Sequence, residues 1–82
     1  MDKILIELYV PAMGAVYDVF IPRKSKTHDV LFLLSETVEE LTEGRYLPTQ
    51  DVVLCRENGE ILNINMSSAE HGLLNGSMLM LI

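Results

Sequence analysis

Residues 27–43 read THDVLFLLSETVEELTE, and this stretch decides the fold because it has the period of an amphipathic helix. At 3.6 residues per turn, the side predicted to be buried consists of Val30, Leu33, Leu34, Thr37, Val38 and Leu41. The opposite side consists of Ser35, Glu36, Glu39 and Glu43. We expect Thr27 to be the N-cap and Gly44 to be the glycine at the C′ position after the helix. One amphipathic helix cannot bury its apolar side alone, so the flanking segments must supply a sheet.

The residues before the helix alternate with the period of two that is typical of half-buried strands. In residues 3–10, one face consists of Ile4, Ile6, Leu8 and Val10. In residues 16–21, the corresponding face consists of Tyr17, Val19 and Ile21. Residues 11–14 form a turn between the two strands, and residues 22–26 cross to the helix. The sequence therefore predicts a hairpin followed by the helix.

The residues after the helix predict further strands. A loop over 45–50 leads into a strand over 51–56, and the Asn58-Gly59 turn sends the chain back through Ile61-Leu62. Residues 67–70 suggest a short 3₁₀ or helical turn. Residues 77–82, SMLMLI, are apolar on both sides, which is typical of a central strand. We expect an α+β fold in which a mixed sheet of four to five strands packs on one helix.

Composition excludes several classes of function. The 82 residues suit one domain over 1–82 with a single core and no room for a deep catalytic cleft, so we expect no small-molecule substrate. Twelve acidic and six basic residues give a net charge of −6, which would repel nucleic acid. Because Cys55 is the only cysteine, an intramolecular disulfide and a cysteine-based zinc or iron–sulfur site are excluded. No apolar stretch reaches the roughly 20 residues of a membrane span, and a signal peptide is lacking, so we expect a cytoplasmic protein.

No group of residues predicts catalysis, a cofactor or a metal. His28 and His71 have no spacing that links them to a triad or a metal motif, and Cys55 is expected to be an unreactive strand residue. The basic connector Arg23–Lys26 precedes the helix N-terminus, where an anion could bind, but a solvated loop is the preferred interpretation.

The helix carries an acidic face made of Glu36, Glu39, Glu40 and Glu43, which we interpret as a solvated surface with docking as the alternative. Phe32 falls beside this face, and we expect a loop to cover it. If no loop covers it, Phe32 is a contact residue.

The order of two strands, a helix, a short hairpin, a small turn and a final central strand resembles the β-grasp fold of ubiquitin-like proteins along the whole chain. Within that group the chain is most similar to the YukD/EsaB-type family of bacterial type VII secretion. The similarity is carried by residues 4–8 (ILIEL), 16–21 (VYDVFI) and 72–79 (GLLNGSML). The first turn and the residues around 45–49 and 63–68 are longer than in the family pattern. The resemblance implies a non-covalent role in or beside the secretion machinery.

The carboxyl end distinguishes two functional classes. Ubiquitin and the β-grasp sulfur carriers end in a flexible tail with a Gly-Gly pair, whereas this sequence ends with Leu81-Ile82 inside a predicted strand. We therefore expect a non-conjugating protein-interaction module, a cytosolic accessory of type VII secretion. The alternatives are a β-grasp carrier or modifier of another pathway, and a stand-alone interaction domain unrelated to secretion.

The open face of the predicted sheet is the candidate binding surface. Side chains that alternate with the inward set point away from the helix, and most of them are apolar. We expect one apolar patch made of Leu5, Phe20, Met78, Met80 and Ile82, with Val53 as an extension. A patch of this kind favours a protein partner or a homodimer. Met80→Asp should then abolish association without unfolding the protein, whereas Leu79→Asp should unfold it.

Overall fold

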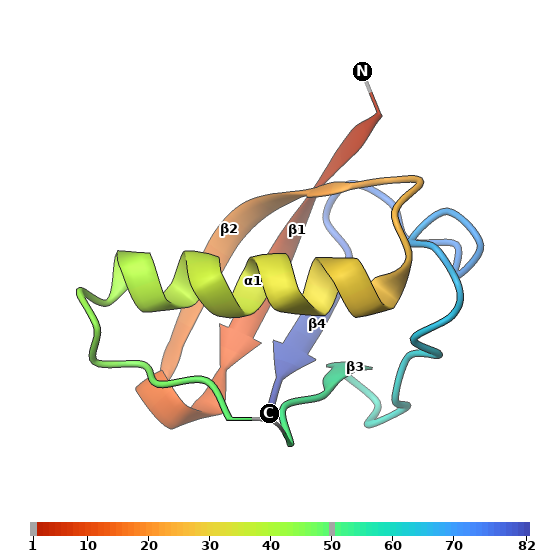
Figure 1. The fold of residues 1–82 in the computed structure, drawn as a ribbon. Helices are drawn as coiled ribbons and strands as arrows, with labels where there is room; N and C mark the ends of the chain where they lie inside the picture. Colours follow the sequence, from red (N-terminus) through yellow and green to blue (C-terminus); the bar gives the residue numbers. More distant parts are fainter. Residues whose placement is uncertain (1, 50) are drawn as a thin grey trace.

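The computed structural model describes residues 2–49 and 51–82; Met1 and Gln50, the last residue of the predicted 45–50 loop, lie outside them. Figure 1 shows one helix lying across a sheet of four strands in the order β2-β1-β4-β3. The elements are β1 (Lys3–Val10), a 3₁₀ turn (Pro11–Met13), β2 (Ala15–Pro22), α1 (Thr27–Leu41), β3 (Leu54–Arg56) and β4 (Met78–Leu81). β1 and β4 are parallel, and the other two pairs are antiparallel. The predicted α+β, β-grasp class with a mixed sheet is confirmed, and the last strand lies inside the sheet as predicted.

The first hairpin follows the predicted alternation closely. Along β1, the inward residues Ile4, Ile6, Leu8 and Val10 are all buried. β2 pairs with β1 over its full length, so that Ile6 lies opposite Val19 and Ile4 lies opposite Ile21. A period of two fixes which face of each strand contacts the helix, because slipping by one residue would expose the whole apolar set.

The second hairpin is shorter than predicted. Of residues 51–56, only Leu54–Arg56 form a strand, and Ile61 makes a single isolated bridge to Cys55. Val53 and Ile82 still exchange two backbone hydrogen bonds, with N···O distances of 2.8 and 3.0 Å. Gly59 closes the turn with a φ of +91°, a conformation that glycine adopts without strain.

The buried side of the helix is rotated relative to the one predicted, with three core residues in common. Val30, Leu34 and Val38 are buried as expected. Leu33 and Leu41 are 40% and 54% exposed, so their assignment to the core was wrong. Ser35, which was placed on the outer side, is buried and donates its hydroxyl to the Leu31 carbonyl at 2.9 Å.

The reason is that Leu31, rather than Leu33, packs against the core. Helical period predicts the width of an apolar stripe, but contacts with the rest of the chain set its rotation.

The start of the helix is capped by backbone and not by a side chain. Lys26, not Thr27, is the N-cap residue, and it makes no side-chain cap. The N–H groups of Thr27 and His28 donate to the carbonyls of Met66 and Ile64 at 2.8 and 3.0 Å. The Thr27 hydroxyl donates to the same Met66 carbonyl, so this residue anchors the 62–77 segment to the helix. The predicted N-cap is therefore wrong by one position.

The end of the helix is a Schellman motif displaced by one residue from the prediction. The C-cap is Thr42, which places Glu43 at C′ with a φ of +54° and Gly44 at C″ with a φ of +84°. The Glu43 N–H donates to the Glu40 carbonyl at 3.1 Å, and the Gly44 N–H donates to the Glu39 carbonyl at 2.9 Å. The position that favours glycine most strongly is thus occupied by a glutamate.

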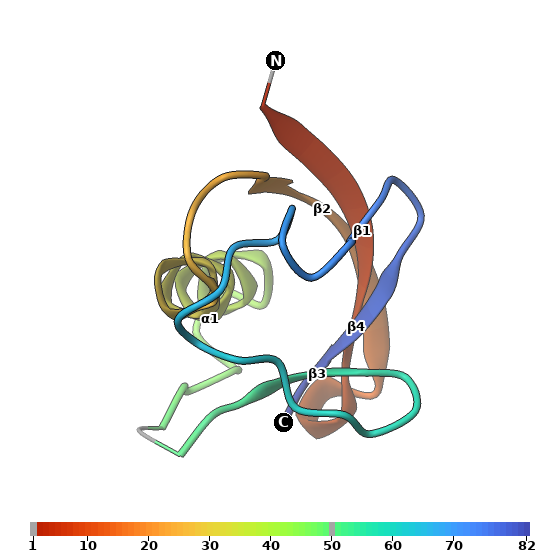
Figure 2. The same cartoon turned by 90° about the vertical axis from the view of Figure 1, so that its right-hand side faces the viewer.

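A long irregular segment, residues 62–77, crosses from the second hairpin past the helix N-terminus to β4, as the blue trace of Figure 2 shows. Residues 67–70 form the predicted turn, which is held by a reciprocal capping box. The Ser67 N–H donates to Glu70 Oε1 at 2.8 Å, and the Glu70 N–H donates to Ser67 Oγ at 3.1 Å.

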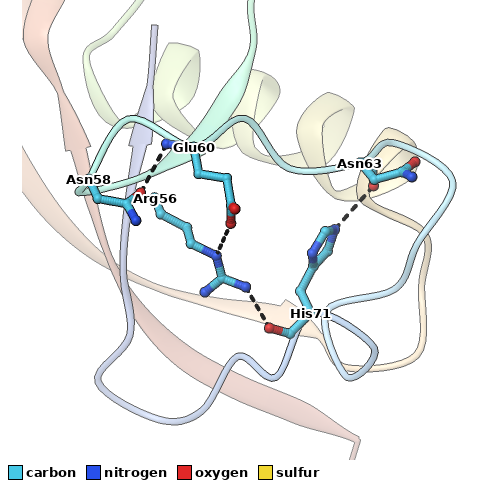
Figure 3. Close-up of polar contacts among 5 residues, drawn as sticks. All are labelled: Arg56, Asn58, Glu60, Asn63 and His71. Atoms are coloured by element: carbon cyan, nitrogen blue, oxygen red, sulfur yellow. Dashed lines mark hydrogen bonds and ion pairs between the residues drawn. The ribbon is translucent and has the colours of Figure 1, made fainter.

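Arg56 links this segment to the second hairpin (Figure 3). Its Nε donates to Glu60 Oε1 at 2.9 Å, and its Nη2 donates to the His71 carbonyl at 2.6 Å. One guanidinium therefore binds two parts of the chain that contain little regular structure.

Candidate protein interface

The sheet has an open face on the side opposite the helix. In Figure 2 the helix lies on one side of the sheet, and the opposite side of β2, β1 and β4 is bare among the described residues. Strand pairing orders the side chains of this face into rows that run across the strands, because paired residues point to the same side. The rows show which side chains are neighbours.

One row crosses the entire sheet and is apolar throughout. Val16 pairs with Tyr9, Tyr9 with Met80, Met80 with Cys55, and Cys55 with Ile61. We call this set, Val16, Tyr9, Met80, Cys55 and Ile61, the apolar row. Its two ends are the most exposed, with Val16 at 53% and Ile61 at 62%. Tyr9 and Met80 are half-buried and Cys55 is buried, so the row exposes apolar area from Val16 to Met80 and again at Ile61.

The five residues predicted for the interface all lie on this face, but they do not form one patch. Ile82 follows Met80 by two residues and pairs with Val53, so this pair extends the apolar row on one side. Leu5 and Phe20 are paired with each other at the other end of β1 and β2. The predicted set is therefore divided into two apolar parts.

The row that lies between the two parts consists of Asp18, Glu7 and Met78, so it is acidic on β2 and β1 and apolar on β4. Glu7 lies opposite Asp18 on the hairpin, and Met78 is the neighbour of Glu7 on β4. Both carboxylates are exposed, and neither has an ion-pair partner among the described residues. Directly opposed like charges destabilise a strand pair by a few tenths of a kcal/mol or more, so this row is a polar boundary on an otherwise apolar face.

The patch predicted from the sequence does not contain Tyr9, Val16 or Ile61, which belong to the apolar row. Outward alternation was sufficient to find the first two, but their contact with Met80 depends on strand register. The Asn58-Gly59 turn could have predicted the position of Ile61, because a tight hairpin at this turn brings Ile61 opposite Cys55. The apolar row could therefore have been assembled only from pairing partners.

Cys55 is a buried part of this row. Its side chain lies between Met80 and Ile61, and its Sγ is 3.8 Å from the Met80 carbonyl oxygen. Burial raises the pKa of the Cys55 thiol above its ordinary value, so the thiol stays protonated near neutral pH. This agrees with the expected unreactive strand residue, because the nucleophile is the thiolate.

The two histidines make local contacts. His28 is exposed, with its Nδ1 3.5 Å from Asp29 Oδ1. His71 Nε2 is 3.2 Å from the Asn63 carbonyl, as Figure 3 shows. Over residues 2–49 and 51–82, no group of three or more His, Cys, Asp or Glu side chains has the geometry to hold a metal ion.

The basic connector is not an anion site. The helix N–H groups that an anion would use, those of Thr27 and His28, already donate to Met66 and Ile64. Lys24 extends to Asp2 with an Nζ···Oδ2 distance of 3.6 Å, and both side chains are largely exposed. The interpretation as a solvated loop agrees with this geometry.

Phe32 is not covered by a loop, contrary to the prediction. Its side chain is 65% exposed on the outer side of α1, beside Glu36 and Glu39. The alternative, that Phe32 is a contact residue, is taken up below. In the part of the chain that the structure describes, no helix combines the length and the apolar character that a membrane span requires.

Comparisons with known proteins identify the fold. No family model matches the sequence, and no curated protein matches it. Among solved structures, the ubiquitin-like domain of the Mycobacterium tuberculosis type VII secretion system protein ECCD1 is similar, with a TM-score of 0.81 at 14% identity, over 100% of this chain and 99% of that one.

Two further structures agree. The EccD5 ubiquitin-like domain from Mycobacterium xenopi has a TM-score of 0.84 at 16% identity, with 100% of this chain and 94% of that one covered. The UBL domain of Plasmodium falciparum Dsk2 has a TM-score of 0.74 at 20% identity, with coverage of 96% and 95%. The helix on its four-stranded mixed sheet is therefore a ubiquitin-like β-grasp fold.

Proposed function

We propose that this protein is a non-conjugating ubiquitin-like interaction module that binds a protein partner through the open sheet face. The observation that carries the proposal is the apolar row, in which Val16 and Ile61 are exposed and Tyr9 and Met80 are half-buried on the open face, with the buried Cys55 between Met80 and Ile61. Soluble proteins seldom leave a contiguous apolar surface bare unless another molecule covers it. The half-buried Met80 and Tyr9 suit the centre of such an interface, since methionine adapts its shape and aromatic rings supply large contact area.

The rows of this face would contribute to binding in different ways. The apolar row, extended by Ile82 and Val53, would supply most of the buried area. Glu7 and Asp18 lie at its border and would favour a partner with Lys or Arg at that position. Leu5 and Phe20 form a second, smaller contact beyond the carboxylates, and Met78 lies beside them.

A cytosolic accessory role in bacterial type VII secretion is the setting that we propose. Its support is the likeness of residues 4–8, 16–21 and 72–79 to the YukD/EsaB-type pattern, together with the similarity of the fold to the ubiquitin-like domain of the type VII secretion system protein ECCD1.

The experiment is an affinity capture from a lysate of the source organism with three baits. The wild-type protein is compared with Ile61→Asp, which charges the exposed end of the apolar row. Leu33→Asp, which charges an exposed leucine on the helix, is the matched control. Because both side chains are already exposed, both variants should retain the thermal unfolding midpoint within a few degrees.

We expect the wild type and Leu33→Asp to recover the same secretion-system protein, and Ile61→Asp to lose it. Equal recovery of the partner by all three baits would mean that the partner does not bind through the sheet face. Light scattering of the purified baits tests the homodimer alternative, in which the wild type would be a dimer and Ile61→Asp a monomer. A covalent adduct on the captured protein, detected by intact mass, would contradict the non-conjugating mode.

A further inference from the structure

A second surface, independent of the sheet face, lies between the helix and the loop that follows it. A groove of about 750 Å³ runs along the outer side of α1. The helix side is lined by His28, Asp29, Leu31, Phe32, Ser35, Glu36 and Glu39, and the loop side by Pro48, Thr49 and Val52. Along the helix, residues 28–39 span roughly 16 Å at 1.5 Å per residue, which is the length of about five residues of extended chain. The groove therefore has the length of a peptide segment.

The base of the groove is apolar. Leu31 and Val52 are half-buried and pack against the hydrophobic core, so they form a fixed floor. Phe32 is 65% exposed, and Pro48 is exposed on the opposite side. A bulky apolar side chain of a partner could pack between the exposed phenylalanine ring and the apolar floor. Each Å² of apolar surface that this contact removes from water would contribute roughly 25 cal/mol to binding.

The rim of the groove is acidic. Glu36 and Glu39 lie one helical turn apart on the helix side, and neither has an ion-pair partner among the described residues. Asp29 lies at the other end, 3.5 Å from His28. The helix also carries Glu40 on its exposed surface and no lysine or arginine between residues 27 and 41. The groove consequently combines an apolar floor with negative charge along one side.

We propose that this groove binds a segment of a partner protein in which a bulky apolar residue is flanked by lysine or arginine. The apolar residue enters between Phe32 and Val52, and the flanking cations pair with Glu36 and Glu39. Charge complementarity selects this occupant over an acidic or neutral segment, because a like-charged segment would be repelled along the whole helix face. A polyanion such as nucleic acid is excluded for the same reason.

The test is a selection from a random-peptide library displayed on phage. The target is the wild-type protein, with counter-selection against the triple variant Phe32→Ser, Glu36→Lys, Glu39→Lys. All three side chains lie on the helix surface outside the core, so the variant should fold. We expect the enriched peptides to carry a leucine, isoleucine or aromatic residue flanked by lysine or arginine. If no peptide is enriched over the triple variant, or if the enriched peptides are acidic or neutral, the proposal is wrong.

Binding of one enriched peptide is then measured by NMR titration against single variants. Phe32→Ala and Glu36→Lys should each weaken binding by about tenfold, since an aromatic anchor and a partly desolvated charge pair are each worth roughly 1 kcal/mol or more. Glu57→Lys, which reverses an exposed charge outside the groove, is the matched control and should weaken binding less than about threefold. Raising the salt from about 0.05 to 0.5 M should weaken binding to the wild type more than to Glu36→Lys.

Two further outcomes are decisive. If the wild type is a dimer that Glu36→Lys and Lys24→Glu both dissociate, the occupant is the connector of a second copy, and the partner-segment proposal is wrong. Ile61→Asp, which disables the sheet face, should leave peptide binding unchanged. If it abolishes peptide binding, the peptide occupies the sheet face and not this groove.

Discussion

Glu43 shows how a single residue can hold a strained conformation because its neighbours require it. Its φ of +54° lies in the left-handed region, which costs an L-residue about 1 kcal/mol relative to glycine. The conformation persists because the N–H groups of Glu43 and Gly44 donate to the carbonyls of Glu40 and Glu39 in the last turn of the helix. The carboxylate is also near the negative end of the helix dipole, which is an unfavourable place for an anion.

We expect Glu43→Gly to raise the free energy of unfolding by about 1 kcal/mol, because glycine adopts a positive φ without a Cβ clash. Urea denaturation at neutral pH measures the change. Glu43→Ala is the control, since it removes the same charge but keeps the strain, and it should gain only roughly 0.3 kcal/mol from the dipole. If alanine stabilises the protein as much as glycine does, charge rather than backbone strain limits this helix end.

At the scale of elements, the turn over residues 67–70 is fixed by its capping box. The backbone N–H of Ser67, and secondarily its side chain, donate hydrogen bonds that lower the pKa of the Glu70 carboxyl below its ordinary value. The positive charges of His71 and Lys26 act in the same direction. Because the ionised form is favoured in the folded state, ionised Glu70 stabilises the fold above its unfolded pKa of about 4.3.

This contribution is lost as the pH falls through the lowered pKa of the folded state, and Glu70→Gln should lack it. The amide oxygen can still accept from Ser67, so the variant should fold at pH 7 with somewhat reduced stability. Urea midpoints of both proteins measured from pH 6 to about pH 3 should converge as the pH decreases. A constant difference across that range would mean that ionisation of Glu70 does not contribute to stability.

The elements differ in how much of them could be predicted from sequence. The hairpin of β1 and β2 was predicted nearly residue by residue, because Ile4, Ile6 and Leu8 can face the helix only in one register. The helix was located correctly, but its rotation was not, because Leu31 and Leu33 flank the stripe of Val30, Leu34 and Val38 on opposite sides and tertiary packing determines which of the two leucines is buried.

The candidate interface was also predictable only in part, because alternation within a strand can be read from the sequence and pairing between strands cannot. Alternation identified Met80 and Ile82 as outward residues of the last strand. The strand order then places this strand beside the segment that contains Val53. That Glu7 and Asp18 separate them from Leu5 follows from strand pairing, which the sequence of one strand does not contain. The groove beside Phe32 was missed because it depends on the path of the loop that contains Pro48 and Val52.

At the scale of the whole molecule, the sheet separates a closed side from an open side. Leu79 and Leu81 point from β4 into the core and are almost fully buried. Met80, between them in sequence, points to the other side and lies between Tyr9 and Cys55. Two neighbouring residues of one strand therefore experience opposite environments, and this contrast tests the architecture independently of any partner.

Leu79→Asp should leave the protein unfolded, because an unpaired carboxylate in the core and the loss of the leucine contacts together cost about 5 kcal/mol or more, and a small domain lies near the lower end of the usual stability range of roughly 5–15 kcal/mol. Met80→Asp should remain folded with a loss of roughly 1–2 kcal/mol, since water can reach the carboxylate on the open face while some packing on Tyr9 and Cys55 is lost. Circular dichroism melting and amide dispersion in NMR spectra distinguish the two results. If Met80→Asp unfolds as completely as Leu79→Asp, the face that carries the apolar row is closed to solvent, and the sheet cannot offer it to a partner.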